Sequence, residues 1–79
     1  MKQIEVLSLN TEGIKSIEKL TKREYEIFSL LSKGLSNYEI ANTLCISEKT
    51  VRNNLTSIYR KLNLKGRSEA ILFFQKNQL

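Results

Sequence analysis

Residues 35–51 read LSNYEIANTLCISEKTV, a stretch with two helix starts separated by a short turn. At the first start Ser36 is a typical N-cap residue, and Glu39 three positions later completes a capping box between two apolar residues. At the second start Ser47 takes the N-cap position and a threonine replaces the glutamate. Signatures of this kind mark where helices begin. The stretch therefore predicts a short helix, a tight turn and a longer helix, over residues 36–43, 44–46 and 47–62.

Two further helices are expected on either side of this stretch. Residues 20–25 read LTKREY, which repeats the capping box with Thr21 as N-cap. A helix over 21–33 follows, and Gly34 stands where a left-handed C-terminal cap belongs. Another helix is predicted over 67–76. The expected fold is all-α, a four-helix bundle that contains a helix-turn-helix and carries an N-terminal arm.

The chain of 79 residues has room for one small domain only. We place this domain over residues 20–79 and interpret residues 1–19 as an N-terminal arm or linker. Within the arm, Ile14 and Ile17 recur at the spacing of a helical turn, which favours a short helix there.

The residue types in the chain argue against catalysis. The sequence contains no histidine, no aspartate and a single cysteine. Ser-His-Asp and Cys-His systems are therefore excluded, as are histidine-bearing zinc sites and a phosphate-accepting aspartate. We expect no enzyme activity, no catalytic residue, no metal and no cofactor. Cys45 is interpreted as a half-buried apolar residue of the turn rather than as a redox sensor.

The sequence also indicates where the protein resides. It has no apolar run long enough to span a bilayer, and its N-terminus lacks the layout of a signal peptide. A single cysteine fits a reducing compartment. We therefore expect a soluble, cytoplasmic protein with no membrane partner.

The net charge of +5 is concentrated in one segment. Residues 47–67 contain six Lys and Arg residues against Glu48 alone, whereas the charges balance within 1–20, 21–46 and 68–79. Such a focused charge is typical of a surface that binds a polyanion. A basic helix face that meets only water explains the charge equally well.

The helix predicted over 47–62 has an apolar side and a polar side. At the period of an α-helix, the apolar residues Val51, Leu55, Ile58 and Leu62 fall on one narrow stripe. Arg and Asn, the side chains that recognise guanine and adenine edges, lie on the opposite side with Lys and Thr, which suit phosphates. A short helix, a turn and a helix with such a face have the layout of a DNA-binding helix-turn-helix. An ordinary amphipathic helix would explain the period, but not the near-absence of acidic residues from the polar side.

Five blocks with matching spacing resemble the LuxR/GerE-type helix-turn-helix domain: residues 20–27, 34–41, 46–53, 59–62 and 66–70. The resemblance covers roughly residues 20–74. It implies a four-helix bacterial DNA-binding domain that regulates transcription, often as the output domain of a response regulator. It also implies that the third helix lies in the major groove of double-stranded DNA, and that the fourth helix supports a homodimer on a pseudo-palindromic site. The chain begins with Met and is too short to hold a receiver domain, so a stand-alone regulator and an excised effector domain both stay open.

The resemblance assigns base contacts to Arg52, Asn53 and Thr56. The predicted DNA-backbone contacts combine matched positions at helix starts and flanks with the other cations of the basic segment: Ser36, Asn37, Ser47, Lys49, Thr50, Asn54, Arg60, Lys61, Lys65 and Arg67. The family often has His at the position of Asn54, so a neutral hydrogen bond to phosphate is expected there.

The helix predicted over 67–76 is apolar on all sides around Ile71, Leu72, Phe73 and Phe74, which is unusual for a surface helix of a monomer. Either the N-terminal arm or a second subunit covers one side. We favour the second subunit, predict these four residues as the dimer interface, and expect assembly to be weak without DNA. RNA polymerase is a further candidate partner.

The alternative function is a protein-interaction module that keeps the helix-turn-helix scaffold without binding DNA. The charge distribution favours DNA binding, because an interaction module has no need to concentrate its basic residues on one face.

Overall fold

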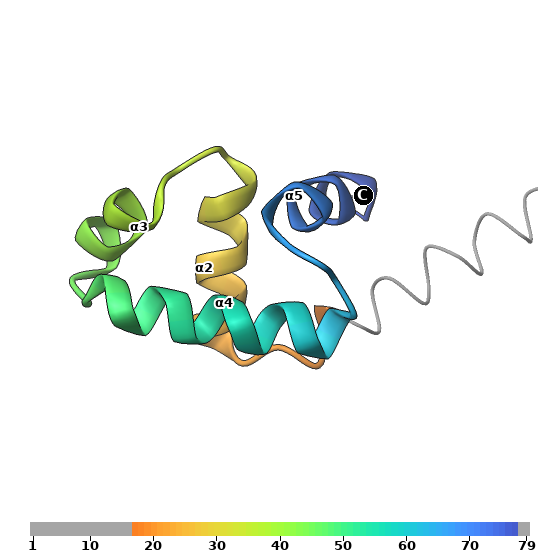
Figure 1. Ribbon diagram of the computed structural model, residues 1–79, viewed down its shortest axis with the longest axis horizontal. Coiled ribbons are helices and arrows are strands. Elements are labelled where there is room, and N and C mark those ends of the chain that lie inside the picture. The colour runs from red at the N-terminus through yellow and green to blue at the C-terminus, as the bar shows by residue number, and fades with distance from the viewer. Residues whose placement is uncertain (1–16, 78–79) are drawn as a thin grey trace, which may run out of the picture.

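The computed structural model describes residues 17–77. This part of the chain forms four helices and no strand: α2 (Lys22–Ser32), α3 (Asn37–Leu44), α4 (Glu48–Leu62) and α5 (Arg67–Lys76), as Figure 1 shows. The all-α class and the four predicted helices are confirmed, and each helix bound lies within one residue of its predicted position. Most of the predicted arm, residues 1–19, lies outside the described residues.

Side-chain caps explain where α2, α3 and α4 begin. Thr21 Oγ1 accepts a hydrogen bond from the Glu24 N–H at 3.1 Å, and Glu24 Oε1 accepts one from the Thr21 N–H at 2.9 Å. The same reciprocal pair joins Ser36 and Glu39, at 3.1 and 2.8 Å. Ser47 Oγ accepts the backbone N–H three residues further on at 3.1 Å. The two capping boxes and the third N-cap are therefore confirmed.

Left-handed residues stand where α2, α3 and α4 end. Gly34, Cys45 and Asn63 have φ angles of 92°, 58° and 55°. Glycine adopts this conformation freely and asparagine tolerates it, but a cysteine is strained by about 1 kcal/mol. The Cys45 side chain is exposed, which corrects the expectation of a half-buried residue. The left-handed backbone leaves its neighbours Leu44 and Ile46 to pack against the core instead.

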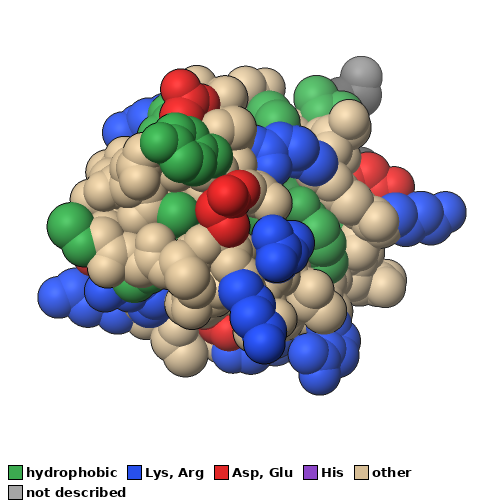
Figure 2. Space-filling view, turned by 60° about the vertical axis from the view of Figure 1, so that its left-hand side comes forward, with side chains coloured by type: hydrophobic (Ala, Val, Ile, Leu, Met, Phe, Trp, Pro, Cys, Tyr) green, Lys and Arg blue, Asp and Glu red, His purple; other side chains and the backbone are tan. Residues whose placement is uncertain are grey.

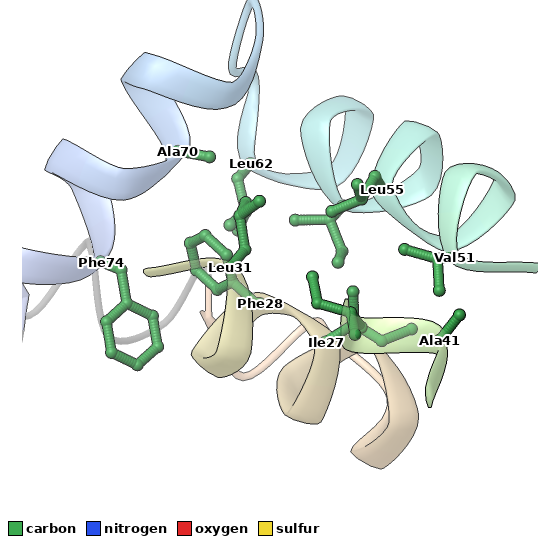
Figure 3. Packing of buried hydrophobic residues seen from close by; sticks show 11 residues of the cluster. Ile27, Phe28, Leu31, Ala41, Val51, Leu55, Leu62, Ala70 and Phe74 are labelled. Atoms are coloured by element: carbon green, nitrogen blue, oxygen red, sulfur yellow. The ribbon is translucent and has the colours of Figure 1, made fainter. Parts of the chain in front are cut away.

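The helix α2 lies at the centre of the fold and packs against each of the other three helices. Figure 3 shows its side chains Phe28 and Leu31 between residues of α4 and α5. The predicted apolar stripe of α4 is confirmed, since its four residues are at most 6% exposed: Val51, Leu55, Ile58 and Leu62. Because this stripe is used up in the core, the opposite face of α4 is turned to solvent.

The helix α5 packs on α2 through aromatic side chains. Phe74 meets Phe28 edge-on, with the ring centroids 5.0 Å apart. Phe74 is 4% exposed, so the prediction that it lies in a dimer interface is wrong: it fills the core of its own chain. Leu72 is 61% exposed, while Ile71 and Phe73 are partly buried against the core.

Candidate nucleic-acid interface

The helices α3 and α4 form a helix-turn-helix around the turn at Cys45. The Cys45 N–H donates to the carbonyl of Asn42 at 3.3 Å, and the Ile46 N–H donates to the carbonyl of Ala41 at 3.0 Å. This pattern satisfies the last carbonyls of α3 and fixes the direction in which the chain enters α4. The helix α3 also packs directly against α4.

The three predicted base-contacting residues share the open face of α4. Arg52, Asn53 and Thr56 are all exposed. The Thr56 hydroxyl donates to the carbonyl of Arg52 at 3.1 Å, so its proton is committed to the helix and its oxygen stays an acceptor. The structure thus brings the three side chains together on successive turns of one helix.

Exposed cations extend this face. Lys49, Arg52, Arg60 and Lys65 are exposed, and within residues 17–77 none of them takes part in an ion pair. Figure 2 shows Lys and Arg side chains gathered in the lower part of the molecular face, where α4 runs. Glu48, the acidic residue of α4, lies in its first turn, where the helix dipole favours a negative charge.

Local hydrogen bonds organise the predicted phosphate contacts at the helix starts. The Ser47 hydroxyl donates to Thr50 Oγ1 at 2.9 Å, and Asn54 Nδ2 donates to the Thr50 carbonyl at 2.8 Å. Thr50 Oγ1 and Ser36 Oγ act as acceptors in these bonds. The hydroxyl protons of Ser36 and Thr50 therefore stay available to a further acceptor, such as a phosphate oxygen.

Lys61, another predicted phosphate contact, is partly buried and has partners within the protein. Its Nζ lies 2.7 Å from Glu24 Oε1 and donates to the carbonyl of Lys19 at 3.3 Å. Ser57 donates to Glu24 Oε2 at 2.7 Å. Glu24 is 6% exposed, so one buried carboxylate ties the start of α2 to the last two turns of α4.

The protonation of Glu24 reflects these contacts. Burial alone would raise the pKa of the Glu24 carboxyl, but hydrogen bonds from Lys61, Thr21 and Ser57, with the charge of Lys61, outweigh it. They lower the pKa from 4.5 to about 2. The carboxylate is therefore ionised at neutral pH and neutralises Lys61. The sequence contains only a weak indication of this cluster: Ser57 and Lys61 lie four residues apart, on the same flank of α4.

Arg67 also has partners within the protein. Its Nη1 donates to Asn37 Oδ1 at 3.0 Å, and its Nη2 donates to the carbonyl of Leu35. The contact joins the start of α5 to the start of α3 and brings together two predicted phosphate contacts. Of the six cations in segment 47–67, the four that face solvent without such a contact are therefore Lys49, Arg52, Arg60 and Lys65.

Comparison with known proteins shows to which family the chain belongs. Residues 18–74 match the family model described as bacterial regulatory proteins, luxR family. The chain belongs to the luxR family. The resemblance drawn from the five sequence blocks is thereby confirmed, and DNA binding in transcription regulation is the general function of this luxR-family domain.

Three relatives illustrate the match. The chain is 53% identical over 53 residues to the spore germination protein GerE of Bacillus subtilis (strain 168), which is 67% of this chain and 72% of GerE. It is 42% identical over 62 residues to the transcriptional regulatory protein LiaR of the same strain, covering 78% of this chain and 29% of LiaR. It is 44% identical over 61 residues to the response regulator protein VraR of Staphylococcus aureus (strain NCTC 8325 / PS 47), covering 76% of this chain and 29% of VraR. The luxR-family chain thus spans less than a third of the length of the last two.

The names of LiaR and VraR describe regulators rather than enzymes. Within residues 17–77, no helix has the length and apolar character needed to cross a bilayer.

Proposed function

We propose that this luxR-family domain binds double-stranded DNA in a sequence-specific way, with α4 in the major groove. The supporting observation is the open face of α4, where exposed cationic and amide side chains stand opposite a buried apolar stripe. A major groove about 12 Å wide admits a helix of about 10–12 Å diameter, so this face can reach base edges.

Three side chains are assigned to the bases. Arg52 is suited to donate two hydrogen bonds to a guanine, and Asn53 to pair with an adenine edge. Thr56 adds an acceptor oxygen and a methyl group that suits the thymine methyl. Their exposure on successive turns of α4 supports a readout of neighbouring base pairs.

Phosphate contacts are assigned to the flanks of the groove. Ser36, Ser47 and Thr50 lie at the starts of α3 and α4, where backbone N–H groups and the helix dipole favour an anion. Asn54 reaches the same region through Thr50. The exposed side chains of Lys49, Arg60 and Lys65 add charge. Lys61 and Arg67 are not assigned a phosphate, because both are engaged within the protein.

The domain is proposed to act as a dimer on a pseudo-palindromic site. Leu72 of α5 is exposed over 61% of its surface, and Ile71 and Phe73 beside it are only partly buried. Two copies joined through this apolar patch would place their α4 helices on half-sites about one helical turn apart.

Binding measured against salt concentration tests the proposal. A preferred duplex is first selected from a random pool, and its affinity is compared with that of a scrambled duplex. Each neutralised phosphate contributes a slope of about −0.9 to log affinity against log salt. The three exposed cations assigned to phosphates, Lys49, Arg60 and Lys65, predict a slope of about −2.7 per subunit, whereas direct phosphate contacts by Lys61 and Arg67 as well would give about −4.5.

Two outcomes would overturn the proposal. Binding that does not depend on salt would show that the basic face does not meet phosphates. Absence of binding to any duplex at low salt would favour the alternative function, a protein-interaction module on the same scaffold.

A further inference from the structure

The contact between Asn37 and Arg67 joins residues that are distant in sequence and belong to different helices. The Arg67 guanidinium is partly buried and uses both terminal nitrogens, one on Asn37 Oδ1 at 3.0 Å and the other on the Leu35 carbonyl. A guanidinium has only donors, in a planar fork, and here the fork meets two acceptors at the start of α3.

This contact decides which way the Asn37 amide faces. An asparagine side chain has an acceptor oxygen on one side and a donor NH₂ group on the other. Since Arg67 can only donate, the oxygen of Asn37 must face it and the NH₂ group is turned away. Asn37 is the first residue of α3 and is partly exposed, so the two N–H donors of its side chain lie at the helix start.

We infer that Arg67 is a positioning residue for DNA binding: it holds the Asn37 amide with its NH₂ group toward a backbone phosphate and does not itself neutralise one. The inference rests on the proposed function, since it requires the start of α3 to lie at the DNA backbone. The positive end of α3 favours an anion there, and the oriented amide adds a donor that an unrestrained side chain would supply only part of the time.

Direct and indirect roles of Arg67 differ in their dependence on salt. An arginine that neutralises a phosphate releases a counterion and contributes to the salt slope. A neutral amide that donates to a phosphate contributes a hydrogen bond but no such slope. Arg67→Ala should therefore weaken binding without changing the slope.

The first experiment measures affinity for a labelled random-sequence duplex over a range of salt concentrations. Variants are Arg67→Ala, Asn37→Ala, the double variant, and Lys49→Ala as a matched loss of one exposed cation. Arg67→Ala and Asn37→Ala should each weaken binding about 3- to 10-fold, the loss expected for one hydrogen bond. The double variant should be no weaker than Asn37→Ala alone. Lys49→Ala should reduce the slope by about 0.9.

A reduced slope for Arg67→Ala, like that of Lys49→Ala, would overturn the inference and show a direct phosphate contact. Losses that multiply in the double variant would also overturn it, because independent contacts behave in that way. Circular dichroism of each variant checks that the helices remain formed.

A second pair of variants keeps the inference testable if Arg67→Ala does not fold. Asn37→Asp keeps an acceptor for Arg67 but replaces the outward NH₂ group with a carboxylate oxygen. Asn42→Asp makes the same charge change at an exposed position of α3. Asn37→Asp should bind more than 10-fold more weakly than Asn42→Asp, since it alone loses the oriented donor. Equal affinities would overturn the inference.

Failure of the proposed function would look different. In that case the unchanged protein would not bind the duplex at all, or Lys49→Ala would leave the salt slope as it was.

Discussion

Arg52 and Lys49 lie on the same exposed face of α4, but they suit different parts of a duplex. The planar fork of Arg52 matches a guanine edge, whereas the ammonium of Lys49 is a point charge suited to phosphate. Arg52→Ala should cost about 1–3 kcal/mol on the preferred site and relax the preference at one base position. Lys49→Ala should weaken all sequences by a similar factor. Selection from a random pool, repeated with each variant, measures both effects. Unchanged base preferences for Arg52→Ala would show that the side of α4 carrying Arg52 does not face the groove.

The Glu24 carboxylate predicts a specific pH dependence of stability. Its pKa is about 2 in the folded protein against 4.5 for the ordinary group. A lowered folded-state pKa means that the ionised form stabilises the fold, so the stabilisation is complete above pH 4.5 and is lost as pH falls toward 2. The shift corresponds to about 3 kcal/mol. Urea unfolding of the wild type and of Glu24→Gln across this range should show a stability difference that shrinks as the pH falls.

Lys61→Met serves as the companion variant, because it removes the ion-pair partner and keeps the length of the side chain. It should also reduce the pH dependence between 2 and 4.5, since the Glu24 carboxylate loses its charged donor. Identical pH profiles for the wild type and both variants would contradict the role of this cluster.

The contact between Glu24 and Lys61 and the contact between Asn37 and Arg67 are the part of the site that the sequence analysis does not predict. Glu24 meets Lys61 across 37 positions, and Arg67 meets Asn37 across 30 positions. Helix periodicity and capping rules act within a few residues, so they identify the face of a side chain but not its distant partner. The sequence pattern therefore predicts all six cations of the basic segment as DNA contacts, whereas only four of them are exposed and Lys61 and Arg67 are partly buried.

At the scale of elements, the turn of the helix-turn-helix carries measurable strain. Cys45 has a φ of 58° without being glycine, and its exposed side chain contributes little packing. Cys45→Gly should therefore raise the free energy of unfolding by about 1 kcal/mol, somewhat offset by the greater freedom of glycine in the unfolded chain. Thermal and urea unfolding measure the change.

Asn63→Gly is the matched control for this prediction, because Asn63 has a similar φ of 55° at the end of α4. Asparagine tolerates the left-handed region, so the gain from glycine should be smaller there. A loss of stability for Cys45→Gly would contradict the interpretation and show that the cysteine side chain contributes to packing.

The element boundaries could be predicted because their causes are local. Thr21 and Ser36 form capping boxes with glutamates three residues away, and the apolar stripe of α4 follows from one period along one helix. The side chain of Cys45 could not be placed in this way, since the residue pattern does not show that the backbone turns left-handed there. The burial of Phe74 depends on how α5 meets α2, which again lies beyond local pattern.

At the scale of the whole molecule, one small core supports two separate surfaces. The central helix α2 contacts α3, α4 and α5, so the apolar sides of the other helices are held against it. This leaves the cationic side of α4 and the apolar patch around Leu72 of α5 exposed on different elements. If the proposed dimer forms through this patch, substitutions should therefore alter DNA contact and self-association separately.

Leu72 is the residue with which to test self-association, because its side chain is 61% exposed and its removal leaves the core intact. Leu72→Glu should abolish cooperative binding to a duplex with two half-sites and leave binding to a single half-site nearly unchanged, since a charge placed in a small apolar interface is costly.

Gln75→Glu is the matched control. It adds the same charge to an exposed position of α5 without removing an apolar side chain, and should keep most of the cooperativity. Gel-shift titrations of both duplexes, with circular dichroism as a check on folding, measure these effects. Full cooperativity in a folded Leu72→Glu variant would show that two copies do not meet through α5, whereas equal loss in both variants would show that charge near the DNA, rather than apolar contact, controls assembly.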